Sequence, residues 1–392
     1  MLQKIKDAIK IFLIYTLRQI LKIFWVLPIN RKRIVFVSFS GRQFSDNSKY
    51  IFIEMQKKYG NKFQYIWCVN KKFPFSCLTE FENVRTVKFL SFKYLIAMIT
   101  CGIYITNCSV EPFIPKRKKQ LFICTWHGGG AYKKLSSFYK KRKSFTIMSE
   151  TRAKMTDYYT SACFSFTKFL APDWYADTNK FLESGMPRND ILIHEYKNEN
   201  LISSLKQKMG IPQDKKTILY APTMRGWAVH PDSFDMTINV EKIIAALEKR
   251  FNGNFIFLFR CHHTMLGRIN VDENVLDMSM YTDMQELLLV TDVLITDYSS
   301  SIWDFSLMLK PCFLFTPDLD NYESYQSFYV PIKEWPFSYA KNNDDLCNEI
   351  EMFNEEVYVK KVFSHHKELG SFEKGSATEI VCQKILEHEG VL

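Results

Sequence analysis

The sequence predicts an α/β protein with two doubly wound domains, each built around a parallel β-sheet, and an amphipathic helix in front of them. Three observations support this class. The chain has 392 residues, more than the roughly 250 to 300 that one hydrophobic core usually organises. Short runs of β-branched and aromatic residues alternate with helix-length segments in both halves. A polar stretch, 184–216, separates the halves.

The first 30 residues predict an amphipathic helix. Their apolar residues recur at every third or fourth position: Leu2, Ile5, Ile9, Phe12, Leu13, Leu17, Ile20, Leu21 and Phe24. The longest uncharged run, Ile11 to Leu17, is far shorter than the roughly 20 residues that span a bilayer. Residues 1–33 hold eight cations and one anion. We therefore expect peripheral binding to the anionic cytoplasmic face of the membrane, with an ordinary helix packed on the protein as the alternative.

The remaining chain predicts two sheets. Apolar runs typical of strands covered on both faces lie at 34–39, 65–69, 103–106 and 121–126 in the first half and at 217–221, 255–259, 293–296 and 312–316 in the second. Gly185 and Pro187 mark the boundary between the halves. We expect domains over residues 31–190 and 210–392. A last helix over 377–388 follows a glycine-containing loop and is placed to return to the first domain.

Charge and cysteine content exclude several classes. The formal charge is +10, and residues 111–143 alone hold ten cations and one anion. Such concentrated segments indicate an anionic partner rather than a uniformly basic nucleic-acid coat, so no nucleic acid is expected. The ten cysteines include no CxxC pair, which argues against a disulfide framework and a structural zinc site. No metal and no cofactor are predicted.

One candidate site follows the strand at 121–126. His127 lies there beside Gly128, Gly129 and Gly130 in a chain with only fourteen glycines. Consecutive glycines allow a ligand to approach the backbone, and a neutral histidine accepts a proton near pH 7. The spacing matches neither the dinucleotide fingerprint nor the P-loop. The residues alone leave a catalytic and a structural role for His127 open.

Three polar clusters follow strands of the second half. These clusters contain Thr223 and Arg225, then Arg260 and His262, then Asp297, Ser299 and Ser300. Ligands of doubly wound sheets bind at the carboxyl ends of the strands, so the clusters predict one crevice. The serines open a predicted helix over 300–309, where hydroxyls and backbone NH groups suit a phosphate, with plain helix capping as the alternative. Asp318 and Asp320 form a DxD pair that we interpret as a solvated turn rather than a metal site.

These motifs resemble the CDP-glycerol glycerophosphotransferases of teichoic-acid and capsule synthesis. The matching segments are Thr125-Trp126-His127-Gly128, Leu219 to Arg225, Arg260-Cys261-His262, and Asp283 to Tyr322 with Thr296-Asp297-Tyr298-Ser299-Ser300. Ser38 to Asn47 and Gly185 to Asp190 fit as well. The similarity spans roughly residues 34–385 in unchanged order.

The resemblance implies a GT-B fold, two Rossmann-like domains facing a cleft, on a peripheral membrane enzyme. Members of this family transfer a polyol phosphate from a CDP-activated donor to a lipid-linked acceptor without a metal. His127 then corresponds to the general base, and His262 with Arg260 to the diphosphate-binding residues that stabilise departing CMP. Ser299 and Ser300 would hold donor phosphate oxygens, with Asp297 and Thr223 in support and Arg225 as added positive charge.

The sequence departs from the family where Gly129 and Gly130 replace the usual Thr-Pro after His-Gly. This alters the loop beside the presumed base, so the reaction class is better defined than the acceptor. CDP-glycerol is the expected donor, with CDP-ribitol as an alternative. The other hypotheses are a GT-B nucleotide-sugar glycosyltransferase and a non-catalytic membrane scaffold or nucleic-acid-binding protein that uses the basic segments. The released product distinguishes the two enzyme hypotheses, because a CDP-polyol phosphotransferase releases CMP and a glycosyltransferase releases a nucleoside diphosphate.

Overall fold

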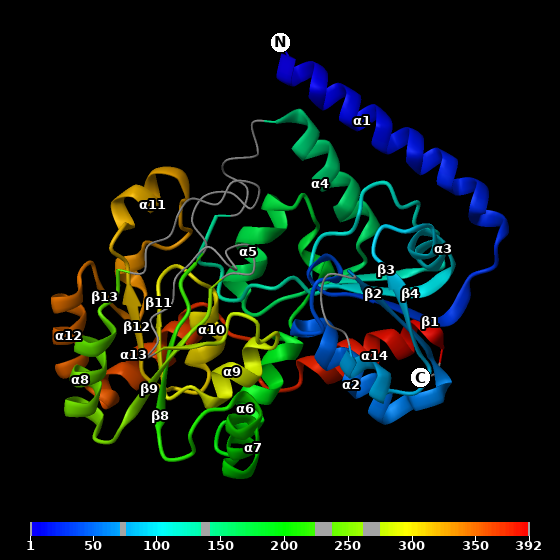
Figure 1. Cartoon of the computed structure of the whole chain (residues 1–392). Coiled ribbons are helices and arrows are strands. Elements are labelled where there is room, and N and C mark those ends of the chain that lie inside the picture. The colour runs from blue at the N-terminus through cyan, green and yellow to red at the C-terminus, as the bar shows by residue number, and fades with distance from the viewer. Residues whose placement is uncertain (1, 71–75, 135–141, 224–236, 262–274, 391–392) are drawn as a thin grey trace. The chain divides into compact units, whose positions relative to one another are not determined.

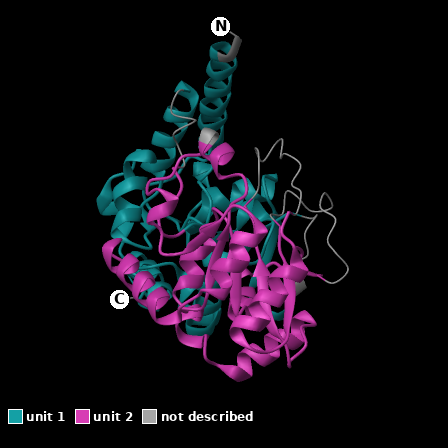
Figure 2. Cartoon of the chain, turned by 90° about the vertical axis from the view of Figure 1, so that its left-hand side faces the viewer, with its two compact units in different colours: residues 1–128, 135–190, 372–392 teal, residues 129–134, 191–371 magenta. Residues whose placement is uncertain are grey.

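The computed structural model describes residues 2–70, 76–134, 142–223, 237–261 and 275–390. The chain divides into two compact units (Figure 2). Unit 1 comprises residues 1–128, 135–190 and 372–392, and unit 2 comprises residues 129–134 and 191–371. Two segments therefore depart from the expected domains, because 129–134 belongs to unit 2 and 372–392 to unit 1.

Within the described residues, unit 1 has a sheet of seven parallel strands in the order β3-β2-β1-β4-β5-β6-β7. The strands are β1 (Asn30–Val37), β2 (Gln64–Val69), β3 (Val84–Lys88), β4 (Cys101–Thr106), β5 (Leu121–Cys124), β6 (Tyr158–Thr160) and β7 (Phe181–Leu182). The helices are α1 (Leu2–Leu21), α2 (Asp46–Tyr59), α3 (Phe92–Thr100), α4 (Lys143–Met155), α5 (Phe164–Asp173) and α14 (Ala377–Glu389). The order reverses between β1 and β4, as in a Rossmann sheet (Figure 1).

The core of unit 1 lies on both faces of this sheet. Alternate residues of β1 point to opposite sides, so Ile34 and Phe36 join one buried cluster while Val35 and Val37 join the other. The first cluster includes residues of α2 and α14, and the second includes residues of α3. The C-terminal helix therefore completes the core of the first unit, although more than 180 residues separate it from that unit's last strand.

The motif Gly185 to Asp190 attaches α14 to unit 1. The Asp190 carboxylate accepts hydrogen bonds from the backbone of Ala377 and Thr378, at 3.1 and 2.7 Å, and so caps the start of α14. Glu373 accepts from the Met186 backbone at 3.1 Å and from the Asn189 side chain at 2.9 Å. This polar motif explains why the last segment packs with the first unit.

Unit 2 repeats the same topology. Its described strands form a parallel sheet in the order β10-β9-β8-β11-β12-β13. The strands are β8 (Lys216–Tyr220), β9 (Phe255–Phe259), β10 (Val275–Asp277), β11 (Val293–Thr296), β12 (Cys312–Phe315) and β13 (Ser338–Ala340). The helices are α6 (Asp190–Glu195), α7 (Glu199–Met209), α8 (Val240–Phe251), α9 (Met284–Val290), α10 (Ser301–Ser306), α11 (Leu319–Tyr325), α12 (Asn343–Glu351) and α13 (Glu355–Glu368). Here the order reverses between β8 and β11.

The eight predicted strands and the helix over 377–388 are present, with three corrections. Strand β5 ends at Cys124 rather than at residue 126, because Trp126 has a φ of 55°. Helix α10 covers Ser301–Ser306 rather than 300–309. The predicted turn at Asp318 and Asp320 is the start of α11, where Asp318 accepts from the Tyr298 hydroxyl at 3.0 Å and Asp320 pairs with Lys341.

Residues 129–134 are held in unit 2 by tight packing and backbone pairing. Lys133 pairs with Phe328 as an antiparallel bridge, and the Tyr329 backbone donates to the Tyr132 carbonyl at 2.9 Å. A β-carbon on Gly129 would lie 2.4 Å from Cδ1 of the fully buried Trp303. This close approach requires glycine at position 129.

Two histidines at the end of α13, the buried His365 and the partly buried His366, support this packing. The Tyr132 hydroxyl lies 2.9 Å from Nε2 of His365, and the Ser306 hydroxyl lies 2.7 Å from Nε2 of His366. The His366 ring also packs on Trp303, with centroids 4.2 Å apart. Burial lowers the pKa of each histidine to about 4, so both are neutral near pH 7.

The first prediction concerns the acid stability of unit 2. Below pH 6.5 the unfolded chain binds protons at His365 and His366, whereas the folded chain stays neutral there until about pH 4. Each histidine should therefore lower the free energy of unfolding by about 2 kcal/mol between pH 7.5 and 5. Urea unfolding should show a smaller pH effect in His366→Gln and an unchanged one in the exposed-site control His194→Gln. Equal pH effects in wild type and His366→Gln would contradict the assignment.

The second prediction concerns the glycine loop. Gly129→Ala places a methyl group against Trp303, and overpacking of this kind costs about 1 to 3 kcal/mol. The melting temperature should fall by about 3 to 10 °C in differential scanning calorimetry. Ala131→Gly is the control, because Ala131 has a φ of 57° that glycine adopts without strain. A Gly129→Ala protein as stable as wild type would disprove the close approach.

Candidate active site

The candidate base in unit 1 lies beside the switch point of its sheet. His127 follows β5, Asn107 follows β4 and Phe39 follows β1. The Phe39 backbone donates to the Asn107 side-chain oxygen at 2.8 Å, and Nδ1 of His127 lies 2.8 Å from the Asn107 carbonyl. Polar groups from three neighbouring strand ends therefore meet here, as in the ligand sites of doubly wound folds.

The partner of His127 fixes its tautomer. A carbonyl oxygen only accepts hydrogen bonds, so Nδ1 of His127 must carry the hydrogen. In the neutral ring Nε2 then holds the lone pair that can take a proton. The ring is only half-buried and packs against Trp126 and Phe39, with centroids 4.4 and 5.4 Å apart. These contacts fix the orientation of the His127 ring.

A buried carboxyl group supports this histidine electrostatically. Asp46 begins α2 with a φ of 62°, and its carboxylate lies 3.4 Å from Nη1 of the buried Arg188. Burial raises the pKa of the Asp46 carboxyl, while the positive charges of Arg188 and protonated His127 oppose the rise. Coulomb attraction therefore links Asp46 to His127 as well as to Arg188.

The strained residue before the base is also held in place. Trp126 has a φ of 55°, a conformation that costs a bulky residue about 1 to 3 kcal/mol. Its carbonyl accepts a hydrogen bond from the Asn47 side chain at 2.9 Å, and the Asn47 side-chain oxygen accepts from the Arg188 backbone at 3.0 Å. The matched motifs Ser38 to Asn47 and Gly185 to Asp190 therefore contribute by positioning Trp126 and His127.

The predicted anion-binding residues of unit 2 follow three adjacent strands. Thr223 follows β8, Arg260 follows β9, and Asp297 follows β11. The fully buried Asp297 accepts a hydrogen bond from the Thr223 backbone at 2.8 Å, which links the two strand ends at the switch point. Ser299 and Ser300 come next, and the Ser299 hydroxyl accepts from the Ser301 hydroxyl at 3.0 Å.

Arg260 carries a buried positive charge. Its Nη2 donates to the Thr282 carbonyl at 3.4 Å, and in the described part of the chain its buried Nη1 has no hydrogen-bond partner. Burial lowers the pKa of Arg260 to about 10, while nearby Asp283 acts to raise it. The guanidinium therefore stays charged near pH 7 and is suited to bind a phosphate.

The structure describes most of the predicted site residues, and two lie outside the described residues. His127 and Gly128 lie in unit 1, while Gly129 and Gly130 belong to unit 2. Arg225 and His262 fall outside the described residues. No group of three or more metal-ligating side chains occurs among the described residues. Sequence reasoning missed Asn107 and Asp46, although Asn107 directly follows a predicted strand, as do the residues that were found.

Comparisons with known proteins find one family whose similarity covers nearly the whole chain. The profile of the family described as CDP-Glycerol:Poly(glycerophosphate) glycerophosphotransferase matches residues 19–387. The chain is 29% identical over 397 residues to a teichoic acid glycerol-phosphate transferase of Staphylococcus aureus, covering 98% of this chain and 100% of the relative. It is 29% identical over 394 residues to a teichoic acid poly(glycerol phosphate) polymerase of Bacillus spizizenii, covering 94% and 95%.

A solved structure shows the same fold. The wall teichoic acid polymerase TagF, in a variant soaked with CDPG, superposes with a TM-score of 0.83 at 25% identity over 100% of both chains. The chain therefore has the GT-B-like fold of that enzyme, with a parallel sheet in each of its two units. Together with the profile match, this similarity assigns the chain to the CDP-glycerol:poly(glycerophosphate) glycerophosphotransferase family.

Proposed function

We propose that this enzyme transfers glycerol phosphate from CDP-glycerol to a hydroxyl of a membrane lipid-linked acceptor in teichoic-acid or capsular polymer synthesis, with release of CMP. The hydrogen bond from His127 to the Asn107 carbonyl carries the proposal, because it leaves Nε2 as the proton acceptor. The family assignment supplies the donor class. The relatives named above support glycerol as the polyol.

In the proposed reaction, the acceptor hydroxyl gives its proton to Nε2 of His127 and its oxygen attacks the phosphorus that carries glycerol. A new oxygen–phosphorus bond forms, and the diphosphate bridge breaks on the side of CMP, which leaves with the bonding electrons. Arg260 and the hydroxyls of Ser299 and Ser300 stabilise the charge that develops on the phosphate oxygens. The Thr223 backbone and Asp297 hold the strand ends that position them.

Transfer from CDP-ribitol is the second candidate, because a teichoic acid ribitol-phosphate primase of Bacillus spizizenii is 23% identical over 377 residues, with 92% of each chain covered. The test is incubation of purified protein with radiolabelled CDP-glycerol, CDP-ribitol and nucleotide sugars, with lipid acceptor, with and without chelator. We expect labelled lipid and CMP from CDP-glycerol. Release of a nucleoside diphosphate would support a glycosyltransferase instead.

Helix α1 has one face packed on the protein and an exposed apolar face, and the exposed face supports the proposal of membrane binding. The positions Asp7, Ile11, Ile14, Arg18 and Leu21 are its more buried ones and form one face. Arg18 donates to the Pro112 carbonyl at 3.2 Å, and the helix packs along α4 (Figure 1). The opposite face exposes six large apolar residues: Ile5, Ile9, Phe12, Leu13, Leu17 and Ile20.

An exposed apolar face flanked by lysines suits an anionic bilayer surface at the cytoplasmic face of the membrane. Phe12 is 68% exposed and Leu13 is 59% exposed, so packing on the protein does not cover this face. No helix in the described parts of the chain has the length and hydropathy needed to cross a membrane. We therefore propose peripheral attachment through α1.

The third prediction tests the base. His127→Asn keeps an NH donor for the Asn107 carbonyl but lacks a proton acceptor at the position of Nε2. Turnover in CMP release should fall at least about 100-fold, while the KM for CDP-glycerol stays near wild type because the donor groups lie in unit 2. His194→Asn serves as the control. Near-normal turnover in His127→Asn would remove the role of this residue.

The fourth prediction tests the buried cation. Arg260→Gln removes the charge that we assign to the donor diphosphate, so the KM for CDP-glycerol should rise at least about tenfold. The exposed lysine variant Lys249→Gln, in the same unit, should leave this KM unchanged. Donor titrations with acceptor in excess measure both. An unchanged KM in Arg260→Gln, in a protein with a wild-type melting curve, would place the diphosphate elsewhere.

The fifth prediction tests membrane binding. The double substitution Phe12→Asp and Leu13→Asp adds charge to the exposed face of α1. Co-sedimentation with phosphatidylglycerol vesicles should fall at least about tenfold. Val357→Asp with Phe363→Asp changes two exposed apolar residues of α13 and should leave binding unchanged. If both double variants sediment like wild type, α1 does not attach the enzyme.

A further inference from the structure

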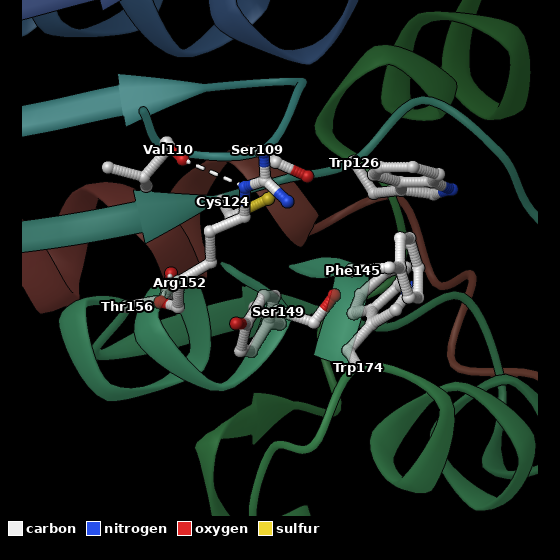
Figure 3. Close-up of a pocket in the computed structure, with 10 residues that line it drawn as sticks. Ser109, Val110, Cys124, Trp126, Phe145, Ser149, Arg152, Thr156 and Trp174 are labelled. Carbon is white, nitrogen blue, oxygen red and sulfur yellow. Dashed lines mark hydrogen bonds between the residues drawn. The ribbon is translucent and has the colours of Figure 1, made fainter. Parts of the chain in front are cut away.

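Unit 1 contains a pocket that the proposed chemistry has not used. It has a volume of about 140 Å³ and lies between α4, the ends of β5 and β6, and the residue that follows α5 (Figure 3). Trp126, Phe145 and Trp174 form an aromatic side, and Arg152 reaches the opposite side beside Ser109 and Cys124. All of its lining residues belong to unit 1.

Arg152 gives the pocket a positive charge with unused donors. Its Nε donates to the Val110 carbonyl at 3.2 Å, which fixes the guanidinium against the wall. Among the described residues, its terminal Nη groups make no hydrogen bond. Burial lowers the pKa of Arg152, while nearby Glu111 acts to raise it. A partly buried guanidinium with free terminal donors is suited to a carboxylate or a phosphate.

The other walls combine apolar surface, which predominates, with several hydroxyl groups. The hydroxyl-bearing residues Ser109, Ser149, Thr156 and Tyr159 also line the pocket, and the rings of Trp126 and Trp174 lie 4.9 Å apart. Aromatic faces pack against CH groups, while hydroxyls exchange hydrogen bonds with those of a ligand. A cavity of about 150 Å³ in another protein holds one benzene molecule, so this pocket accommodates a fragment of similar size.

The pocket adjoins the base through one side chain. Trp126 lines the pocket, and its ring stacks on His127 with centroids 4.4 Å apart. The positive φ of Trp126 and its hydrogen bond from Asn47 fix that ring. A ligand held in the pocket therefore lies one aromatic ring away from the residue that accepts the acceptor's proton.

We propose that this pocket binds the phosphoester of the acceptor next to the hydroxyl that reacts, with Arg152 on the phosphate and Trp126 against the carbon chain. This inference rests on the proposed function. It assigns to Arg152 the recognition of a terminal glycerol phosphate or a like-sized phosphorylated polyol. Free glycerol phosphate and the same group on a lipid share this chemistry, and the test separates them.

The binding test uses the full chain and two variants that alter the pocket differently. Arg152→Gln removes the cation, and Ser149→Leu fills the space without changing any charge. Lys154→Gln, an exposed lysine on α4, is the control. Calorimetric titration with glycerol 3-phosphate should show binding to wild type and the control that weakens at least about tenfold in both pocket variants. Glycerol, which lacks the anion, should bind at least about tenfold more weakly to wild type.

The kinetic test uses CMP release with a lipid acceptor ending in glycerol phosphate. Both pocket variants should raise the KM for this acceptor at least about tenfold and leave the KM for CDP-glycerol unchanged. Wild-type acceptor KM values in both variants would overturn the inference while leaving the proposed function intact. Absence of CMP release in wild type would instead count against the proposed function, and the glycerol 3-phosphate titration would still test the pocket. Equal binding of glycerol 3-phosphate to wild type and both variants would overturn the inference in that case too.

Discussion

The hydrogen bond between His127 and the Asn107 carbonyl is the contact on which the chemistry of unit 1 depends. It assigns the hydrogen to Nδ1 and leaves the lone pair on Nε2, the atom that we propose takes the acceptor's proton. The preceding residue, Trp126, has a strained backbone, and the Asn47 side chain of α2 donates a hydrogen bond to its carbonyl. Asn47 is held by Arg188, in the same motif whose Asp190 caps α14. The C-terminal helix thus supports the base through a chain of polar contacts.

Unit 2 uses the same topology for a different task. At its switch point a buried aspartate, Asp297, links two strand ends, and the neighbouring strand presents the buried cation Arg260. Burying a charge is unfavourable unless a partner compensates it. Arg260 is compensated in part by Asp283, and an anionic donor would complete the compensation. Arg260 is thus a preformed positive charge of the kind that we propose stabilises the donor phosphates.

The strand exits could be predicted because apolar runs followed by polar residues mark the carboxyl ends of buried strands. That pattern located His127, Arg260 and Asp297, which the structure places at such ends. It did not reveal Asp46, whose role depends on burial beside Arg188, more than 140 residues away in the sequence. Nor could it place residues 129–134 in unit 2, because the contacts of Gly129 with Trp303 and of Tyr132 with His365 join distant segments. Contacts between segments that are distant in the sequence produce no periodic pattern that could be recognised locally.

The tautomer of His127 is the most direct test of this account. Nitrogen NMR of protein with ¹⁵N-labelled histidine, with the His127 signals assigned by their loss in His127→Asn, reports which ring nitrogen carries the hydrogen. At a pH where the ring is neutral, we expect hydrogen on Nδ1 and a lone pair on Nε2. Hydrogen on Nε2 would contradict it, because that nitrogen could then not accept the acceptor's proton.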